Sequence, residues 1–261
     1  MEPRKLAVIT GASSGIGYEL AQVCVENSFD VVLVAEQGLE PATDALAASG
    51  AVVQAVPADL ATAAGNEALV AAVRALSRPV DLLALNAGVA AAGPFLETTL
   101  EDDQLLLQTN VHSVVHLAKR LLPDMVSRGQ GRVLITSSIA ATMPGPFYAT
   151  YAASKAFVLS FAEAIRYELK STGVTVTALM PGPTDTDFFD RAGMQDTPVY
   201  SAKKDDPAEV ARDGFEAAMK GDDKVVAGSV TNKVQAAAAK VIPEPIKAAL
   251  HAAQTKPENT E

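Results

Sequence analysis

The chain has 261 residues, of which 49% are hydrophobic and 20% are charged. This length and composition fit one large α/β domain with its own core and exclude disorder over most of the length. The 21 Lys and Arg residues are outnumbered by 31 Asp and Glu residues, and the net charge of -10 repels nucleic acid and anionic membranes. We therefore expect neither nucleic acid nor a membrane as a partner.

The chain begins with MEPRKLAVITG, which runs into a predicted strand without an apolar signal region. Later apolar runs are interrupted before the roughly 18 residues that a membrane span needs. The single cysteine, Cys24, lies in an apolar helical stretch and cannot form an internal disulfide. These features predict a cytoplasmic protein in which Cys24 belongs to the core.

Short β-branched runs alternate with longer Ala-rich segments, a pattern typical of parallel strands joined by helices. The predicted strands are Leu6–Thr10, Val31–Ala35, Val52–Val56, Leu82–Asn86, Val133–Ser137, Val174–Leu179 and, more weakly, Lys224–Ala227. The main predicted helices are Gly15–Asn27, Leu100–Ser127 and Thr150–Ser171. The sequence thus predicts an α/β fold over residues 1–261: a single-domain Rossmann fold, with a doubly wound parallel sheet of about seven strands and helices on both faces.

The pattern loosens after Pro181, where Pro, Gly, Asp and bulky apolar residues mix. We expect residues 187–206 to form a substrate lid. The next segment, DPAEVARDGFEAAMK, predicts a capped amphipathic helix, and residues 254–261 are expected to form a frayed tail. The Ala-rich segment VQAAAAKVIPEPIKAAL is compatible with a surface helix or a partner-docking helix, whereas its low basic content argues against a helix lying on a bilayer.

The first predicted strand runs into TGASSGIG, which places Gly11, Gly15 and Gly17 where a strand turns into a helix. Glycines at such a turn let backbone N–H groups and the positive end of the helix approach a phosphate closely. The spacing differs from G-x-G-x-x-G and from the P-loop, because no Lys-Ser or Lys-Thr pair follows the last glycine. The turn predicts a pyrophosphate site, and a purely structural turn is the alternative.

A second motif, TYAASKAF, places Tyr151 four residues ahead of Lys155 in a predicted helix. At this spacing the two side chains share one helical face, so a phenol and an ammonium can act on the same small molecule. A free phenol has a pKa near about 10, and a nearby ammonium can stabilise its anion. Taken alone, the pair is also compatible with a half-buried ring beside a solvated charge.

Three further features lie between these motifs: NAG at Asn86–Gly88, Asn110 in LQTNVHS, and Ser138 after RVLIT. In their order and spacing, the five features resemble the short-chain dehydrogenase/reductase family, classical type, over residues 5 to about 190. The resemblance implies an NAD(P)-dependent oxidoreductase that transfers a hydride between a nicotinamide and an alcohol or carbonyl carbon. It also implies association as a homodimer or homotetramer.

The resemblance implies a role for each residue of a Ser-Tyr-Lys-Asn site. Tyr151 exchanges a proton with the substrate oxygen, while Lys155 tunes Tyr151 and hydrogen-bonds the nicotinamide ribose. Ser138 hydrogen-bonds the reacting oxygen, and Asn110 holds a water that connects the lysine to solvent. We prefer Ser138 to Ser137 because adjacent strand residues point in opposite directions, and because Ser138 precedes Tyr151 by 13 residues.

The resemblance also implies that a larger set of residues contacts the dinucleotide. Asp59 and Leu60 would meet the adenine, and the segment PGPTDT would receive the nicotinamide carboxamide, with Thr186 as its hydroxyl. The full set is Gly11, Ser13, Ser14, Gly15, Ile16, Gly17, Glu36, Asp59, Leu60, Asn86, Ala87, Gly88, Tyr151, Lys155, Pro181, Gly182, Thr184 and Thr186.

The choice of nicotinamide depends on the residues that reach the adenosine ribose. Family members that use NADP often carry Arg or Lys after the second strand or just before the second glycine of the turn, where they meet the 2′-phosphate. Here those positions hold Ala35, Glu36, Gln37 and Ser14. A carboxylate repels a phosphate and can accept hydrogen bonds from a free 2′-hydroxyl, so the sequence favours NAD over NADP. The usual NAD aspartate position holds Ala35.

The substrate itself is not encoded in a motif. Apolar residues expected around it are Met143, Pro144, Phe147, Phe188 and Phe189, which indicate a partly apolar substrate. Two other function classes share parts of this pattern. A non-catalytic dinucleotide sensor of redox state would keep the fold but tends to lose the tyrosine or the lysine. A sugar-nucleotide epimerase would have glycine spacing G-x-x-G-x-x-G and a longer substrate domain.

Two further sequence features carry less information about function. Tyr148 lies three residues before Tyr151, but Ala152 follows it at the position where a lysine would be needed. His112 and His116 are four residues apart and could share a metal, but no third ligand stands nearby, so we expect no metal site.

Overall fold

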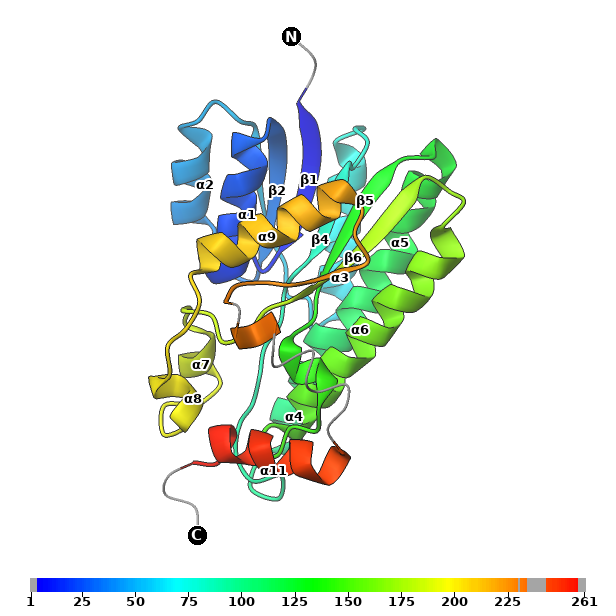
Figure 1. Cartoon of the computed structure of the whole chain (residues 1–261). Coiled ribbons are helices and arrows are strands. Elements are labelled where there is room, and N and C mark those ends of the chain that lie inside the picture. The colour runs from blue at the N-terminus through cyan, green and yellow to red at the C-terminus, as the bar shows by residue number, and fades with distance from the viewer. Residues whose placement is uncertain (1–3, 230, 234–242, 258–261) are drawn as a thin grey trace.

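The fold is built on a seven-stranded parallel sheet (Figure 1). The computed structural model describes residues 4–229, 231–233 and 243–257. Within them the strands are β1 (Lys5–Thr10), β2 (Phe29–Ala35), β3 (Val53–Pro57), β4 (Leu82–Leu85), β5 (Gly131–Thr136), β6 (Val174–Met180) and β7 (Lys224–Val226). Their order across the sheet is β3-β2-β1-β4-β5-β6-β7. The chain therefore winds outward in both directions from the β1–β4 pair, and the predicted doubly wound α/β fold is confirmed.

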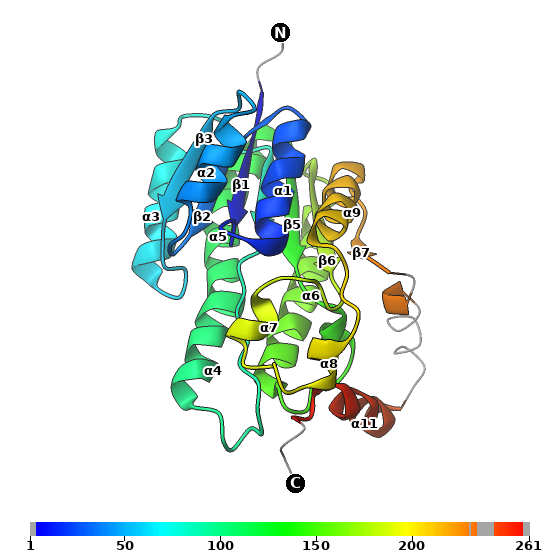
Figure 2. The same ribbon diagram turned by 90° about the vertical axis from the view of Figure 1, so that its left-hand side faces the viewer.

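Helices cover both faces of this sheet (Figures 1 and 2). One face carries α1 (Gly15–Glu26), α2 (Glu40–Ala47) and α9 (Pro207–Lys220). The other carries α3 (Ala63–Ala75), α5 (Ser113–Arg128) and α6 (Ala149–Leu169). Other elements in the described part of the chain are α4 (Leu100–Leu107), a π-helical turn η1 (Gln108–His112), a 3-10 turn η2 (Ile139–Thr142), α7 (Phe188–Arg191), α8 (Pro198–Ser201) and α11 (Glu244–Thr255).

The strands explain why two separate cores form. Successive side chains of a strand point to opposite faces, so a strand buried on both sides is continuously apolar. In β1, Leu6 and Val8 pack with α3, α5 and α6, whereas Ala7 and Ile9 pack with α1, α2 and α9. Cys24 lies in the second core, as expected from the sequence, and burial raises the pKa of its thiol.

Three short helices lie beyond the carboxyl ends of the strands. Figure 2 shows α7, α8 and α11 together below the sheet, at the end opposite to the N-terminus. The segment 187–206 contains α7 and α8, and α11 contacts α8. The helix predicted from DPAEVARDGFEAAMK is confirmed as α9, and the Asp206 side chain caps it by accepting a hydrogen bond from the Ala208 N–H.

Two predicted segments differ from the structure. The helix expected over Leu100–Ser127 is divided into α4, η1 and α5, because the chain widens into a π-helical turn around Asn110. Gln254 and Thr255 were assigned to a frayed tail but lie in the last turn of α11. Residues 258–261 of that tail lie outside the described residues, as do residues 234–242 of the Ala-rich segment.

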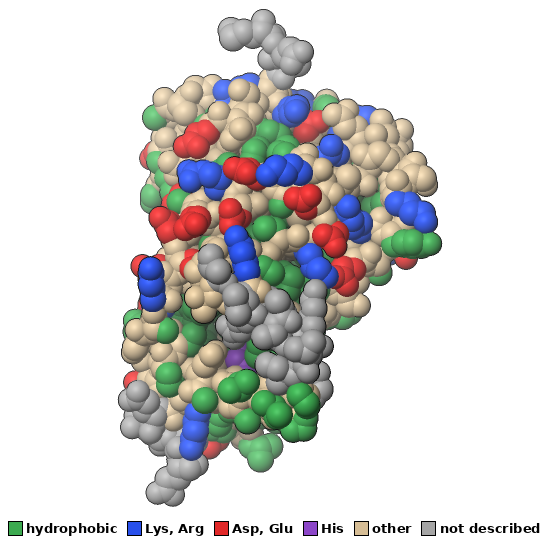
Figure 3. Space-filling model, in the orientation of Figure 1, with side chains coloured by type: hydrophobic (Ala, Val, Ile, Leu, Met, Phe, Trp, Pro, Cys, Tyr) green, Lys and Arg blue, Asp and Glu red, His purple; other side chains and the backbone are tan. Residues whose placement is uncertain are grey.

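The face of the molecule shown in Figure 3 carries charged side chains of both signs. Figure 3 shows side chains of both signs spread over the sheet and α9, and hydrophobic side chains gathered over α11. Ile246 and Leu250 of α11 are 52% and 53% exposed. No helix within residues 4–229, 231–233 and 243–257 has the length and apolar character needed to cross a bilayer.

Candidate active site

A cavity of about 410 Å³ lies at the carboxyl edge of the sheet. Open α/β sheets place their ligands where the strand order reverses, because the flanking crossovers leave on opposite faces there. Here that point is between β1 and β4. The turn after β1, the ends of β4 and β5, helix α6, segment 181–194 and α11 all contribute lining residues. The cavity is therefore where the fold class alone would place a site.

The turn between β1 and α1 forms one wall. Its lining residues are Gly11, Ser13, Ser14, Gly15, Ile16 and Gly17. A Cβ on Gly17 would overlap the carbonyl oxygen of Gly11, and one on Gly15 would lie 2.8 Å from the Thr186 methyl. Side chains at these two positions would therefore close the turn or push segment 181–194 away from it.

The first turn of α1 keeps its N–H groups available. Ser14 is the N-cap, yet its side chain accepts no capping hydrogen bond, and the first turn holds no acidic residue. In contrast, the N-cap side chains of α3 and α4, Thr62 and Thr99, each accept a hydrogen bond from a first-turn N–H. The α1 terminus, facing the cavity without a cap, fits the phosphate group that the sequence predicted there.

The predicted NAG turn is held against β1 by hydrogen bonds. Thr10 Oγ1 accepts hydrogen bonds from the N–H groups of Asn86 and Ala87, at 2.9 and 3.0 Å. The Asn86 side chain donates to the Thr10 carbonyl and accepts from the Thr136 hydroxyl. These contacts join the ends of β1, β4 and β5, and Asn86, Ala87 and Gly88 line the cavity.

Ser138 lies two residues beyond the end of β5, a strand that was predicted to extend to Ser137. Strand β5 ends at Thr136, and Ser138 is the N-cap of η2, where its hydroxyl accepts a hydrogen bond from the Ala140 N–H at 3.1 Å. The neighbouring Ser137 donates its hydroxyl to the backbone carbonyl of Lys155 at 2.8 Å. The Ser137 hydroxyl is thus engaged in holding α6, whereas the Ser138 hydroxyl donates to the Pro181 carbonyl at 3.4 Å and lines the cavity together with Tyr151.

Tyr151 and Lys155 both line the cavity from α6. The Lys155 Nζ lies 5.7 Å from the centroid of the Tyr151 ring, so the two side chains share a helical face as predicted. Only 4% of Lys155 is exposed, and its Nζ donates a hydrogen bond to the Thr136 carbonyl at 3.0 Å. The lysine is therefore positioned by the end of β5.

Burial dominates the titration of this pair. It raises the pKa of Tyr151 to about 12, and the nearby Ser138 hydroxyl acts in the opposite direction. Burial also lowers the pKa of Lys155 to about 8, because a desolvated ammonium is disfavoured. The sequence led us to expect a tyrosine made acidic by Lys155. In the structure Ser138 is the group that favours ionisation of Tyr151, while the Lys155 ammonium is directed at Thr136.

Asn110 reaches the site through the backbone of the NAG turn. It lies in η1, is 1% exposed and is not among the residues that line the cavity. Its Oδ1 accepts from the Val89 N–H, and its Nδ2 donates to the Val89 carbonyl, both at 2.9 Å. Nδ2 also donates to the Ser154 hydroxyl at 3.1 Å. The amide thus joins η1, the NAG turn and α6.

Several residues expected at the site lie elsewhere. Glu36 and Asp59 are exposed and Leu60 is buried in the core, and the cavity reaches none of the three. Asp59 instead accepts a hydrogen bond from the Ala61 N–H at 2.9 Å. The loop residues Met143, Pro144 and Phe147, expected near a substrate, are also not among the lining residues.

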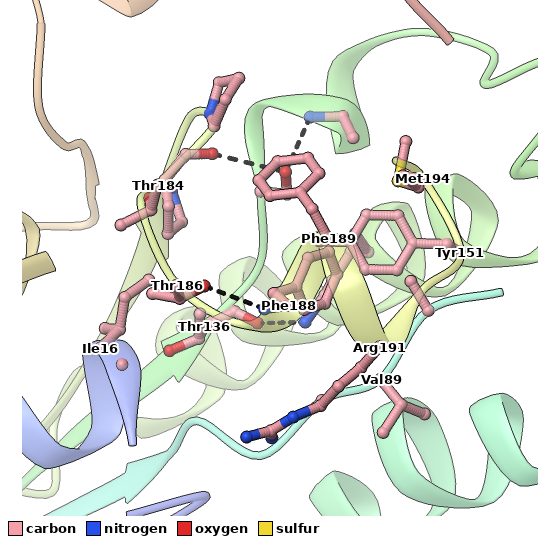
Figure 4. Close-up of a pocket in the computed structure, with 18 of the residues that line it drawn as sticks. Ile16, Val89, Thr136, Tyr151, Thr184, Thr186, Phe188, Phe189, Arg191 and Met194 are labelled. Atoms are coloured by element: carbon pink, nitrogen blue, oxygen red, sulfur yellow. Dashed lines mark hydrogen bonds between the residues drawn. The ribbon is translucent and has the colours of Figure 1, made fainter. Parts of the chain in front are cut away.

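The remaining predicted residues do line the cavity. From segment 181–194 they are Pro181, Gly182, Thr184, Thr186, Phe188 and Phe189. Figure 4 shows Phe188, Phe189 and Met194 beside Tyr151, with Thr184 and Thr186 on the strand-end side. Phe188 lies against Tyr151 with a centroid distance of 5.4 Å. These rings provide an apolar wall next to the phenol.

Tyr148, His251 and Arg191 are among the lining residues that sequence reasoning missed. Tyr148 was set aside, yet it lines the cavity and its hydroxyl contacts His251 Nε2. His251 Nδ1 donates to the Pro144 carbonyl at 2.8 Å, so Nε2 is the acceptor for Tyr148. Arg191 also lines the cavity and donates to the Ser14 hydroxyl. The partners are 103 and 177 residues apart, so no local pattern could have revealed them.

The histidine pair makes no shared site in the structure. His116 Nε2 lies 2.8 Å from Glu67 Oε1, whereas His112 and His116 meet edge to face with centroids 5.9 Å apart. Within the described part of the chain, no group of three or more His, Cys, Asp or Glu side chains could hold a metal ion.

Comparisons with known proteins agree with this geometry. The family model for short chain dehydrogenases matches residues 5–197. The ketoacyl reductase HetN of Nostoc sp. is 33% identical over 202 residues, covering 76% of this chain and 69% of HetN. The 3-oxoacyl-(acyl-carrier-protein) reductase FabG of Escherichia coli is 31% identical over 186 residues, covering 70% of this chain and 75% of FabG.

Solved structures show the same fold with bound cofactors. A short-chain dehydrogenase from Sphingobium yanoikuyae in complex with NADPH matches with a TM-score of 0.78 and 31% identity, covering 85% of this chain and 87% of that chain. A short chain dehydrogenase/reductase from Burkholderia phymatum in complex with NAD matches with a TM-score of 0.78 and 26% identity, covering 91% and 92%. The chain is therefore similar in fold to proteins solved with NADPH and with NAD.

Proposed function

Because the chain belongs to the short chain dehydrogenase family, an oxidoreductase family that uses a nicotinamide cofactor, we propose that Tyr151, Lys155 and Ser138 carry its reaction. The reaction is hydride transfer between the nicotinamide and the alcohol or carbonyl carbon of a small, partly apolar substrate. One observation carries the proposal: the three side chains and the uncapped glycine turn line the same cavity.

The chain offers a continuous path for the dinucleotide along this cavity. The turn from Gly11 to Gly17 would hold the pyrophosphate, and Thr186 and the Pro181–Gly182 turn would hold the carboxamide end. The bound nicotinamide would supply the hydride chemistry. Asn86 and Gly88 would lie beside it, because the hydrogen bonds to Thr10 keep this turn at the carboxyl edge.

Tyr151 would exchange the proton that accompanies the hydride. In the oxidation direction the phenolate takes the hydroxyl proton of the alcohol, and in the reduction direction the phenol returns it to the carbonyl oxygen. A pKa of about 12 suits the donor direction at neutral pH. For oxidation the phenolate needs support, which the Lys155 ammonium and the positive charge of an oxidised nicotinamide would supply.

The other residues would position these groups. Ser138 would hydrogen-bond the reacting oxygen, since it lines the same cavity as Tyr151. Lys155 would reach the nicotinamide ribose from its place beneath the NAG turn, where a Cβ on Gly88 would lie 3.1 Å from the Lys155 Nζ. Asn110 would fix that turn and hold the water that connects Lys155 to solvent.

We favour NAD over NADP as the cofactor. Glu36 follows the last residue of β2 and is exposed, so its carboxylate would meet a 2′-phosphate unfavourably and a free 2′-hydroxyl favourably. Steady-state kinetics with both dinucleotides test the preference. A higher kcat/KM for NADP(H) than for NAD(H) would reject it.

The substrate would enter beside the apolar wall. Phe188, Phe189 and Met194 lie together around Tyr151, and residues 187–206 would act as a lid over them (Figure 4). These rings favour a substrate with an apolar portion next to the reacting carbon. A homodimer or homotetramer and a cytoplasmic location stay predictions from the sequence.

The decisive test removes the phenolic hydroxyl. Tyr151→Phe should lower turnover by a factor of about 10²–10⁴ while NADH binding changes little, because only the proton transfer is lost. Turnover is measured on a panel of ketones and alcohols, and binding is followed by NADH fluorescence. Undiminished turnover in the variant would reject the role of Tyr151. Binding without turnover in the native protein would favour a dinucleotide sensor instead.

A further inference from the structure

Arg191 connects the segment that follows β6 to the glycine turn at the other end of the chain. It is the last residue of α7, and its Nη2 donates to the Ser14 hydroxyl at 3.3 Å and to the Asp187 carboxylate at 3.2 Å. Figure 4 shows its side chain extending away from the rings of Phe188 and Tyr151. Arg191 therefore lies where the cavity meets the start of α1.

The Arg191 guanidinium has N–H groups that donate to no other described residue. Of its nitrogens, only Nη2 hydrogen-bonds another described residue, which leaves the Nε and Nη1 donors for another acceptor. The side chain is 66% exposed and lines the cavity. A planar guanidinium with free N–H groups is well suited to a phosphate, since two parallel hydrogen bonds can form.

Few charged side chains other than Arg191 line the cavity. Among the lining residues, the cations are Lys155 and Arg191, and the carboxylates are Asp102 and Asp187. Lys155 is held by the Thr136 carbonyl near Tyr151, whereas Arg191 is beside the uncapped N-terminus of α1. The two cations thus mark the two ends of the path assigned above to the dinucleotide.

We propose that Arg191 binds a phosphate group of the dinucleotide and so fastens segment 187–206 onto the bound cofactor. This inference rests on the proposed function, and it adds a residue that the local sequence does not offer. The residue before Gly15 in the glycine turn is Ser14, which is uncharged. In the folded chain the guanidinium of Arg191, 177 residues further along the sequence, lies beside it. Thr186, packed on Gly15, begins the segment that carries Arg191 to this place.

Two phosphates of a nicotinamide dinucleotide could be the acceptor. The pyrophosphate is common to NADH and NADPH, whereas the 2′-phosphate belongs to NADPH alone. An equal loss of affinity for both ligands in Arg191→Gln identifies the pyrophosphate. A loss confined to NADPH identifies the 2′-phosphate, and either pattern supports the proposal.

The test measures dissociation constants, not activity. NADH and NADPH are titrated into the full chain and into Arg191→Gln, with fluorescence of the reduced nicotinamide as the readout. Loss of a charge-assisted contact to phosphate should weaken binding by about tenfold or more, and the loss should shrink as salt is raised. Because Arg191 is exposed, the variant should melt within about 2 °C of the parent.

Lys203→Gln is the matched control. It removes one positive charge from the same segment at an exposed position that does not line the cavity, so its affinities should be unchanged. Unchanged affinity of Arg191→Gln for both dinucleotides would overturn the proposal, as would equal losses in the two variants. If the native chain bound neither dinucleotide, the proposed function would fall as well, so the two failures are distinguishable.

Discussion

The two ends of the sheet use charged residues in opposite ways. At the amino edge, carboxylates and guanidinium groups are paired with one another across strand ends. At the carboxyl edge, a buried ammonium, a phenol and a serine hydroxyl surround a cavity instead. The seven strands therefore begin among charged side chains that are paired with one another, and they end beside groups whose pKa values are altered by burial.

The amino edge is organised around Asp30. Its carboxylate lies 2.7 Å from Arg78 and 3.2 Å from Arg4, and it accepts a hydrogen bond from the Val52 N–H at 2.9 Å. Nearby, Asp81 accepts from the Leu6 N–H at 3.0 Å. These ions join the beginnings of β1, β2, β3 and β4, and each has a partner.

At the carboxyl edge, burial disfavours the charged form of Lys155. Burial lowers its pKa to about 8, so the folded state holds this proton less tightly than the unfolded chain does. Burial alone would raise the pKa of Asp30. The hydrogen bonds from the Val52 N–H and from Arg78 outweigh this effect, so the pKa is lowered overall. The comparison teaches that one edge is built for stability and the other for chemistry.

Lys155→Met is the strongest way to test this difference. Turnover should fall by a factor of about 10²–10³, because the phenolate and the ribose lose their cation. The free energy of unfolding should rise by about 1–2 kcal/mol at pH 7, because a desolvated ammonium is replaced by an apolar chain. Activity assays and denaturant titrations measure the two effects.

The pH dependence gives a second readout for this variant. Between about pH 8 and 10.5 the unfolded chain binds the Lys155 proton and the folded chain releases it, so the native protein should gain stability as pH rises through this window. The gain should be absent from Lys155→Met. Lys119→Met, at an exposed site on α5, serves as control. A variant that lost both activity and stability would contradict the comparison.

The sequence predicted the fold because its signals are local. Each strand is a short run that is mostly apolar, rich in β-branched residues except in β4, and the glycine turn lies directly between β1 and α1. Type and order therefore followed from neighbours along the chain. The π-helical turn at Gln108–His112 was missed, since one widened turn barely disturbs the periodicity of a long helix. Asp30 was left out of its strand because a charged residue at a strand start resembles a loop.

The site was predictable only in part. The glycine turn, Ser138, Tyr151 and Lys155 stand in recognisable motifs, and the structure brings them to one cavity. The contacts of Arg191 and His251 join segments far apart in sequence, so tertiary packing alone creates them. The direction of the Tyr151 pKa also depends on burial, which no motif encodes.

Asn110→Ala tests how the interior supports the carboxyl edge. The variant leaves the N–H and carbonyl of Val89 without the side chain that satisfies both. We expect a loss of about 1–3 kcal/mol in the free energy of unfolding. Because the NAG turn would loosen, kcat should fall by roughly tenfold and the dissociation constant for NADH should rise.

Gln108→Ala is the control for this variant, since Gln108 is exposed in the same π-helical turn. Its stability should stay within about 0.5 kcal/mol of the parent. The decrease in kcat at saturating cofactor separates a positioning role from simple loss of folded protein. Full stability and full kcat in Asn110→Ala would show that the Val89 contacts are dispensable.

Asp30→Asn should have the smallest effect on turnover, because the amino edge lies at the opposite end of the sheet from the cavity. Stability should fall by about 1–3 kcal/mol, since Arg78 and Arg4 lose the carboxylate that neutralises them. Thermal and denaturant unfolding measure the loss, and kcat per folded molecule should not change. As control, Glu216→Gln removes an exposed carboxylate paired with Lys220 and should cost less than about 0.5 kcal/mol.

The pH dependence of stability follows from the lowered pKa of Asp30. A carboxyl group whose folded pKa is below its unfolded value of about 3.9 stabilises the protein above that pH, and the stabilisation is lost as pH falls through the folded pKa. The stability difference between the native protein and Asp30→Asn should therefore be constant near pH 7 and shrink below about pH 4. A difference that persisted at acid pH would mean that Asp30 acts through packing and not through its charge.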